Sequence, residues 1–186
     1  MILRIVAALF IAVVTIPGRL QAQNVTEASV AEPQYIDIFY AVDAHGRLID
    51  LEHQTVTYHN KVVPLPGYAS VKVVSKFKPN VASVRVPSTA QFMVRGHDHI
   101  DPASLYELRP LEASKDHREF VTTQGHGSVF TGAKMTNLDQ QALAVRFEQY
   151  GSSSYRIIPE QPLPPGEYAL AVRGRFSELY CFGVDQ

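Results

Sequence analysis

Short apolar runs with a period of two recur along most of this chain, and they constrain its fold more than any other feature. Residues 35–42 are rich in aromatic and β-branched side chains, and turn residues 43–46 separate them from a second alternating run over 48–52. Further runs follow at 56–63, 68–74, 81–86, 91–95, 105–111, 119–123, 145–150, 155–158, 168–172 and 179–184. Successive side chains of a strand point to opposite faces, so the pattern predicts many short strands. We expect an all-β fold, an immunoglobulin-like or related two-sheet antiparallel β-sandwich.

Two stretches depart from this pattern. Asp101 and Pro102 have the residue types that cap and begin a helix, so one helical turn is expected there. Residues 124–142 are Gly-rich and then polar, with no clear period, and they predict a long irregular excursion that includes a short helix near residues 138–143.

The first 22 residues have the layout of a secretory signal peptide. Arg4 precedes an apolar run over residues 5–16, and Pro17, Gly18 and the small residue Ala22 follow. The run is too short to span a bilayer, which takes roughly 20 helical residues, so no stable transmembrane span is expected after processing. Cleavage after Ala22 is the main expectation, and retention of the segment as an anchor is the alternative.

The remaining chain divides into two parts. Residues 23–33 are polar and lack periodicity, so we expect a flexible mature N-terminus. Residues 34–186 have a length that suits a single β-sandwich domain. After removal of residues 1–22, 15 Lys and Arg stand against 18 Asp and Glu, and nothing in this balance predicts a nucleic-acid partner.

Cys181 is the only cysteine, so no disulfide can form within the chain even in an oxidising compartment. It lies between Tyr180 and Phe182 within an apolar run, which favours a buried side chain that packs as a small hydrophobe. Pairing with another molecule, or a reactive thiol, is the alternative.

The segment Leu-Pro-Pro-Gly-Glu-Tyr over residues 163–168 predicts a tyrosine corner. In sandwich domains, a Tyr near the start of the penultimate strand donates a hydrogen bond to backbone a few residues upstream. Tyr168 would take this role. The prolines of the segment would stiffen the chain where it crosses between the sheets, and Gly166 would allow a positive φ. We therefore assign Tyr168, Gly166 and Cys181 structural roles.

This ending resembles a group of small exported bacterial proteins that finish with a Pro-Gly-Glu-Tyr corner and a terminal Cys-Phe-Gly-Val/Ile-Asp. The similarity covers residues 155–159, 163–170 and 181–185, and more loosely the hairpin at 43–51. The resemblance implies an exported β-domain and transfers no functional site.

The segment Arg-Gly-His-Asp-His-Ile-Asp over residues 95–101 is a candidate metal site. In an extended strand His97, His99 and Asp101 point to one side, and two imidazoles can converge on one transition-metal ion. A third ligand from elsewhere would be needed, and His117 or His126 could supply it. The alternative is a solvated loop in which Asp101 caps a turn.

Basic residues are concentrated in one part of the chain. Residues 53–97 contain six Lys and Arg and no Asp or Glu. Lys72, Lys76 and Lys78 share parity, so an unbulged strand would place them in one stripe that could bind an anionic envelope component or an acidic protein. The alternative is that these lysines protect a strand edge from aggregation.

No hydrolase elbow, zinc-protease motif, phosphate loop or dinucleotide fingerprint occurs in the sequence. The sequence therefore favours a non-enzymatic binding module of the periplasm or cell exterior, whose partner is an unknown protein or an anionic envelope component. A metal-binding protein or metal-dependent enzyme that uses His97 and His99 is the alternative, and it would need a transition metal as cofactor.

Overall fold

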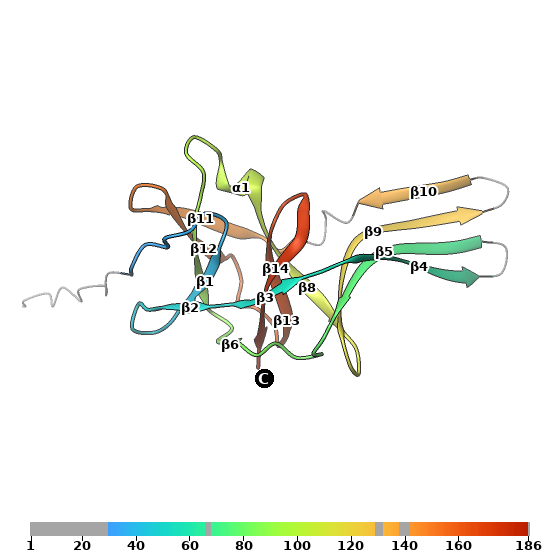
Figure 1. The fold of residues 1–186 in the computed structure, drawn as a ribbon, viewed down its shortest axis with the longest axis horizontal. Coiled ribbons are helices and arrows are strands. Elements are labelled where there is room, and N and C mark those ends of the chain that lie inside the picture. Colours follow the sequence, from blue (N-terminus) through green and yellow to red (C-terminus); the bar gives the residue numbers. More distant parts are fainter. Residues whose placement is uncertain (1–29, 66–67, 129–131, 138–141, 186) are drawn as a thin grey trace, which may run out of the picture.

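The computed structural model describes residues 30–65, 68–128, 132–137 and 142–185 (Figure 1). The smaller sheet contains β1 (Phe39–Val42), β2 (Leu48–Asp50), β7 (Gln91–Arg95), β11 (Val145–Tyr150) and β12 (Ser154–Pro159). The larger sheet contains β3 (Glu52–Thr55), β4 (Tyr58–Leu65), β5 (Tyr68–Phe77), β6 (Arg85–Val86), β8 (Tyr106–Ala113), β9 (Arg118–Ser128), β10 (Gly132–Asn137), β13 (Gly166–Val172) and β14 (Arg175–Val184). The helical turn α1 (Pro102–Leu105) begins after Asp101, whose carboxylate accepts a hydrogen bond from the amide of Ala103, which confirms the predicted cap.

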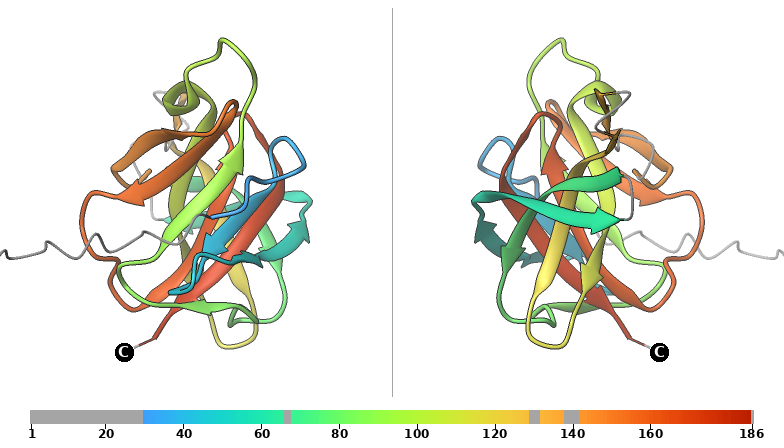
Figure 2. Two further views of the ribbon diagram at one scale, coloured as in Figure 1. Left: turned by 90° about the vertical axis from the view of Figure 1, so that its left-hand side faces the viewer. Right: turned by 90° about the vertical axis from the view of Figure 1, so that its right-hand side faces the viewer.

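The two sheets are built from antiparallel neighbours. The smaller sheet has the order β11-β12-β7-β1-β2, and the larger one follows the path β3-β14-β13-β8-β9-β5-β4, with β10 beside β9 and a short parallel pairing of β6 with β14. The seven strands of this path curl into a half-barrel (Figure 2). β3 and β4 lie at its opposite ends, yet only Val56 and Thr57 connect them in the chain, so the chain itself closes the curl. The predicted all-β architecture with two antiparallel sheets is confirmed.

The main core fills the space between the two sheets. Its buried side chains come from alternating positions of strands in both layers: Phe39, Ala41, Phe92, Val94, Tyr106, Leu108, Ile157, Tyr168, Leu170, Phe182 and Val184. Phe182 is fully buried, with its ring centroid 4.6 Å from that of Phe92 and 5.5 Å from that of Tyr168. The period of two in the sequence thus corresponds to burial of one face of each strand against the opposite sheet.

A second core lies inside the curl, on the opposite face of β13 and β14. It contains Ala169, Ala171, Leu179 and Cys181, which pack with Val56, Phe77, Leu111 and Phe120. Both faces of β13 are therefore buried, which explains why this strand reads as an almost continuous apolar run. The small side chains allow the curled strands to approach one another closely across this narrow interior.

Cys181 is completely buried in this second core, and burial raises the pKa of its thiol to about 12. We expect the thiol to be inert towards an aromatic disulfide reagent at about pH 8 in the native protein and to react fully in denaturant, because the thiolate is the reactive species. Reaction of the native protein at the rate of a free thiol, followed by absorbance, would show that Cys181 is accessible.

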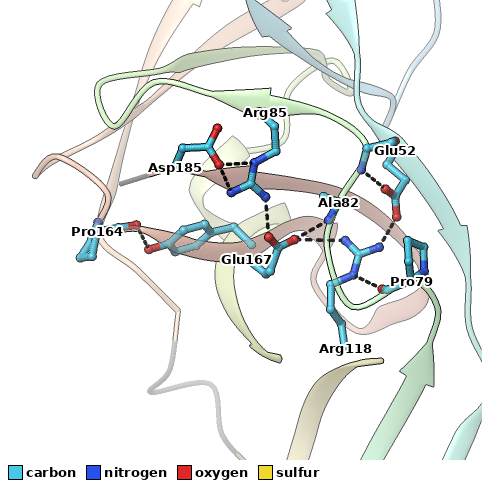
Figure 3. Close-up of polar contacts among 10 residues, drawn as sticks. Glu52, Pro79, Ala82, Arg85, Arg118, Pro164, Glu167 and Asp185 are labelled. Atoms are coloured by element: carbon cyan, nitrogen blue, oxygen red, sulfur yellow. Dashed lines mark hydrogen bonds and ion pairs between the residues drawn. The ribbon is translucent and has the colours of Figure 1, made fainter. Parts of the chain in front are cut away.

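The C-terminal hairpin is fixed by a tyrosine corner. The hydroxyl of Tyr168 donates a hydrogen bond of 2.6 Å to the carbonyl oxygen of Pro164 (Figure 3). Gly166 begins β13 and is not among the described glycines with a positive φ, contrary to the expectation for this position. The stiffness of the corner therefore comes from the prolines and the phenol rather than from a left-handed glycine.

Glu167, next to the corner, is buried at one end of the curl and accepts several hydrogen bonds (Figure 3). Its donors are the amide of Ala82, at 2.7 Å, and the guanidinium groups of Arg85 and Arg118. Arg85 also donates to Asp185, at 2.9 Å from Nε. A Cβ atom on Gly183 would lie 1.5 Å from Nη1 of Arg85, so glycine at this position leaves the space that Arg85 occupies.

Arg118 completes this group of charges and is fully buried. Its Nε donates to the carbonyl oxygen of Pro79 at 2.9 Å, and its Nη atoms contact Glu52 and Glu167. Glu52 in turn accepts a hydrogen bond from the amide of Ser83. These contacts hold the segment between β5 and β6 against the end of the half-barrel.

Residues 124–142 differ from the irregular excursion expected from the sequence. β9 continues to Ser128, and β10 pairs with it from Gly132 opposite Ser128 to Asn137 opposite Thr123. Strand propensity depends on pairing with neighbours, so a Gly-rich segment without apolar alternation can still form a strand when two hydrogen-bonded neighbours are present. Of the helix expected near residues 138–143, residues 138–141 lie outside the described part of the chain.

The first described residues pack against the β11–β12 hairpin. Val30 is buried, and its carbonyl oxygen accepts a 2.6 Å hydrogen bond from the hydroxyl of Tyr150. Glu32 accepts one of 2.9 Å from the hydroxyl of Ser154. Within the segment 23–33, expected to be a flexible leader, residues 30–33 thus belong to the folded part.

The predicted signal peptide lies outside the described residues. No helix within the described residues is long and apolar enough to cross a membrane.

Candidate functional site: a lysine and carboxylate cluster on the large sheet

The large sheet extends beyond the small one. In Figure 1, the β4–β5 and β9–β10 hairpins project away from the layer formed by β1, β2, β7, β11 and β12. On β8, the side chains of the face that packs between the sheets change from buried to exposed along the strand. Leu108 is buried in the main core, whereas Pro110 and Glu112 are exposed. Residues that pair across neighbouring strands lie on the same face of a sheet. The charged side chains of β9 and β5 beside this end of β8 therefore belong to the face of Glu112.

On this face, like charges lie directly opposite one another across strands. Lys61 of β4 is the register partner of Lys72 of β5, and Glu112 of β8 is the partner of Glu119 of β9. Directly opposed like charges are destabilising. The two pairs compensate each other, because Lys61 bonds to Glu119, at 3.2 Å, and Lys72 to Glu112, at 3.3 Å.

Glu119 is the centre of the cluster, and its side chain is only 3% exposed. Its carboxylate contacts Nζ of Lys61 at 3.2 Å, Nζ of Lys76 at 3.1 Å and Nε2 of His117 at 3.0 Å. Burial alone would raise the pKa of Glu119, but the hydrogen bonds from His117, Lys76 and Lys61 outweigh it and lower the pKa to about 2. The carboxylate is therefore charged throughout the physiological pH range and holds three cationic groups together.

His117 links Glu119 to the turn between β8 and β9. Its Nδ1 lies 2.7 Å from Asp116, and its Nε2 contacts Glu119. The hydrogen bond to Asp116, together with that to Glu119, raises the pKa of His117. The imidazole therefore carries positive charge at a higher pH than a free histidine would.

Beside this centre, the surface forms a shallow depression of about 410 Å³. It is lined by Lys76, Phe77, Lys78, Asp116 and His117. Three of the five lining side chains are cationic or become so on protonation. Two of these, Lys76 and His117, are anchored from below by Glu119, which restricts them to positions beside the depression. We refer to Lys61, Lys72, Lys76, Lys78 and His117, with their carboxylate partners, as the lysine cluster.

Of the predicted stripe, Lys72 and Lys76 lie on β5, whereas Lys78 follows the last residue of that strand and lines the depression. The extra residue at the irregularity between β5 and β9 falls on β9, so the strand with the lysines keeps its alternation. Sequence reasoning did not place Lys61 and Glu119 beside these lysines, and it considered His117 only as a metal ligand. The alternation of residues around Glu119 predicts the face of the strand on which it lies. Its lysine partners are 43 and 58 residues away in the sequence and could be found only from strand register.

The predicted metal ligands are not brought together. His97 contacts Asp37, at 3.2 Å, while His99 is exposed with a φ of 63° and Asp101 caps α1. Of the two histidines considered as a third ligand, His117 belongs to the lysine cluster, and the side chain of His126 lies outside what the structure describes. Within the described part of the chain, no group of three or more His, Cys, Asp and Glu side chains could hold a metal ion.

The lysine cluster suits the binding of an anion. It combines lysine ammonium groups and the imidazole of His117 with carboxylates, of which Glu119 stays ionised. Ammonium groups bind phosphate and sulfate oxygens as point charges. No protein-family model, curated protein or solved structure matches the chain. Its function is therefore inferred from its own side chains.

Proposed function

We propose that this protein is a non-enzymatic, exported binding module that recognises phosphate or sulfate groups of an anionic envelope component through the lysine cluster. The observation that supports this most directly is the depression in which Lys76, Lys78 and His117 surround a shared space above the ionised carboxylate of Glu119. Preorganised cations lose less conformational entropy on binding than free lysine side chains do.

Export and an immunoglobulin-like relationship are part of the same proposal. The signal-like pattern of residues 1–22 supports export to the periplasm or cell exterior, where anionic polymers and lipid headgroups are available ligands. The tyrosine corner of Tyr168 and the core between two antiparallel sheets support a relationship to immunoglobulin-like sandwiches.

The proposal is tested by comparing two double variants that remove the same charge. Lys76→Gln with Lys78→Gln should weaken binding to vesicles containing phosphatidylglycerol, or to dextran sulfate, about 30-fold at low salt, since each lysine near an anionic surface contributes on the order of 1 kcal/mol. Arg47→Gln with Arg146→Gln is the matched control, because both arginines are exposed and each is paired with one carboxylate. Binding is measured by sedimentation with vesicles and by calorimetry with the polymer.

The two ligands separate the possible sources of the anion. Binding to vesicles alone assigns the site to lipid headgroups, and binding to both assigns it to a general envelope polyanion. Equal weakening by both double variants, or binding to poly-glutamate alone, would overturn the proposal. If the Lys76 variant is poorly folded, Lys72→Gln with Lys78→Gln tests the same surface, since neither of these lysines is bonded to Glu119.

A further inference from the structure

A second polar site lies away from the lysine cluster and is independent of it. Asp37, just before β1, has a φ of 63°, a left-handed conformation that is uncommon for a residue other than glycine. Its carboxylate accepts hydrogen bonds from the hydroxyl of Tyr106, at 2.9 Å, and from Nε2 of His97, at 3.2 Å, and it pairs with Arg175. Strained backbone with several convergent partners is typical of ligand sites.

These groups adjoin a pocket of about 370 Å³ between the start of β1 and the first half of β14. Ile36, Ile38, Val172 and Tyr180 form its apolar part, and Asp37, Arg175 and Glu178 form its charged part. The volume falls in the range of small-molecule sites. The ring of His53 stacks on Tyr180 with centroids 5.0 Å apart and contacts Glu178, which supports one wall.

The charged groups of the pocket differ in their hydrogen-bond partners and in their exposure to solvent. Asp37 accepts three hydrogen bonds and is a positioning residue that holds Arg175 at the rim. The guanidinium of Arg175 has five N–H donors and is 66% exposed, and the carboxylate of Glu178 is 51% exposed. The pocket thus presents a donor group for a carboxylate, an acceptor for an ammonium group, and an apolar surface between β1 and β14.

We propose that this pocket binds a small zwitterion with an apolar side chain, such as a free branched-chain amino acid. Arg175 would donate to the ligand carboxylate, Glu178 would accept from the ligand ammonium group, and the isoleucines with Val172 would contact the aliphatic side chain. A ligand with only one of the two charges would leave either Arg175 or Glu178 desolvated without a new partner.

Calorimetric or NMR titrations with leucine, leucinamide and 4-methylpentanoate test this assignment. Leucinamide lacks the carboxylate and 4-methylpentanoate lacks the ammonium group, so each should bind at least about tenfold more weakly than leucine. Arg175→Gln should abolish the preference of the protein for leucine over leucinamide. Glu178→Gln should abolish its preference for leucine over 4-methylpentanoate. Arg146→Gln and Glu148→Gln, on the smaller sheet, should change neither preference.

Three outcomes would overturn the inference. One is the absence of saturable leucine binding up to about 10 mM, a concentration that would nearly fill even a site with a Kd of about 1 mM. The second is equal binding of all three compounds by the wild-type protein. Chemical shift changes confined to residues outside the pocket would likewise assign the binding to another surface.

Discussion

Replacement of Arg118 with methionine is expected to lower the free energy of unfolding by about 3 to 5 kcal/mol, the typical cost of breaking a buried ion pair by removing one partner. Methionine preserves much of the side-chain volume but leaves Glu52 and Glu167 without their shared guanidinium. The cation–π contact with Phe77, at 4.9 Å from its ring centroid, and the hydrogen bond to Pro79 are lost as well. Urea denaturation at pH 7 measures the change.

Two further variants separate the charge of Arg118 from its packing. Adding Glu52→Gln and Glu167→Gln to the methionine variant should recover part of the loss, because neither carboxylate that contacted Arg118 then remains charged. Arg118→Lys should lie between wild type and methionine, since an ammonium group cannot bridge both carboxylates as a planar guanidinium does. A loss under about 1 kcal/mol for the methionine variant, or no recovery on adding the glutamines, would contradict this role.

Glu119→Gln is expected to destabilise the protein by about 3 kcal/mol at pH 7. The pKa of Glu119 falls from 4.5 to about 2 in the folded state, and each unit of such a difference corresponds to about 1.4 kcal/mol. The folded state binds fewer protons than the unfolded state between these values. This contribution is therefore complete above about pH 5 and is lost as the pH falls towards 2.

The pH dependence distinguishes this effect from a general loss of packing. Wild-type protein should lose more stability than Glu119→Gln between pH 5 and pH 2, so the difference between them should shrink on acidification. Glu112→Gln is the matched control, because its carboxylate is 53% exposed and pairs with one lysine, and it should change stability by less than about 1 kcal/mol. A constant difference between wild type and Glu119→Gln across this pH range would exclude the proposed electrostatic role.

The C-terminal motif shows how far sequence reasoning reaches in this protein. The corner at residues 163–168 and the alternation of β13 and β14 predict the position of Tyr168 and the apolar core beneath it, because both depend on local spacing. The same motif also contains Glu167, Gly183 and Asp185. Their roles could not be predicted from local spacing. They form one unit with Arg85, which comes from a segment about 80 to 100 residues earlier and meets them only in the folded chain.

The lysine cluster marks the limit of that reasoning. The shared face of Lys72 and Lys76 follows from the pleat of β5, and Lys78 comes directly after that strand. The pairing of Lys61 with Lys72 and of Glu112 with Glu119 depends on the register of two hairpins, which a period of two does not specify by itself. Similarly, β10 and the end of β9 form without apolar alternation, since pairing of the backbone decides their conformation.

The salt dependence of polyanion binding tests the central claim most directly, because it counts the charges engaged in the complex. The logarithm of the dextran sulfate affinity should fall linearly with the logarithm of the salt concentration, and the slope should decrease by roughly one for each cluster lysine that is replaced. The slope for Lys76→Gln with Lys78→Gln should thus be about two smaller than that of wild type, while the Arg47 and Arg146 double variant keeps the wild-type slope. Identical slopes for all three proteins would contradict binding through the lysine cluster.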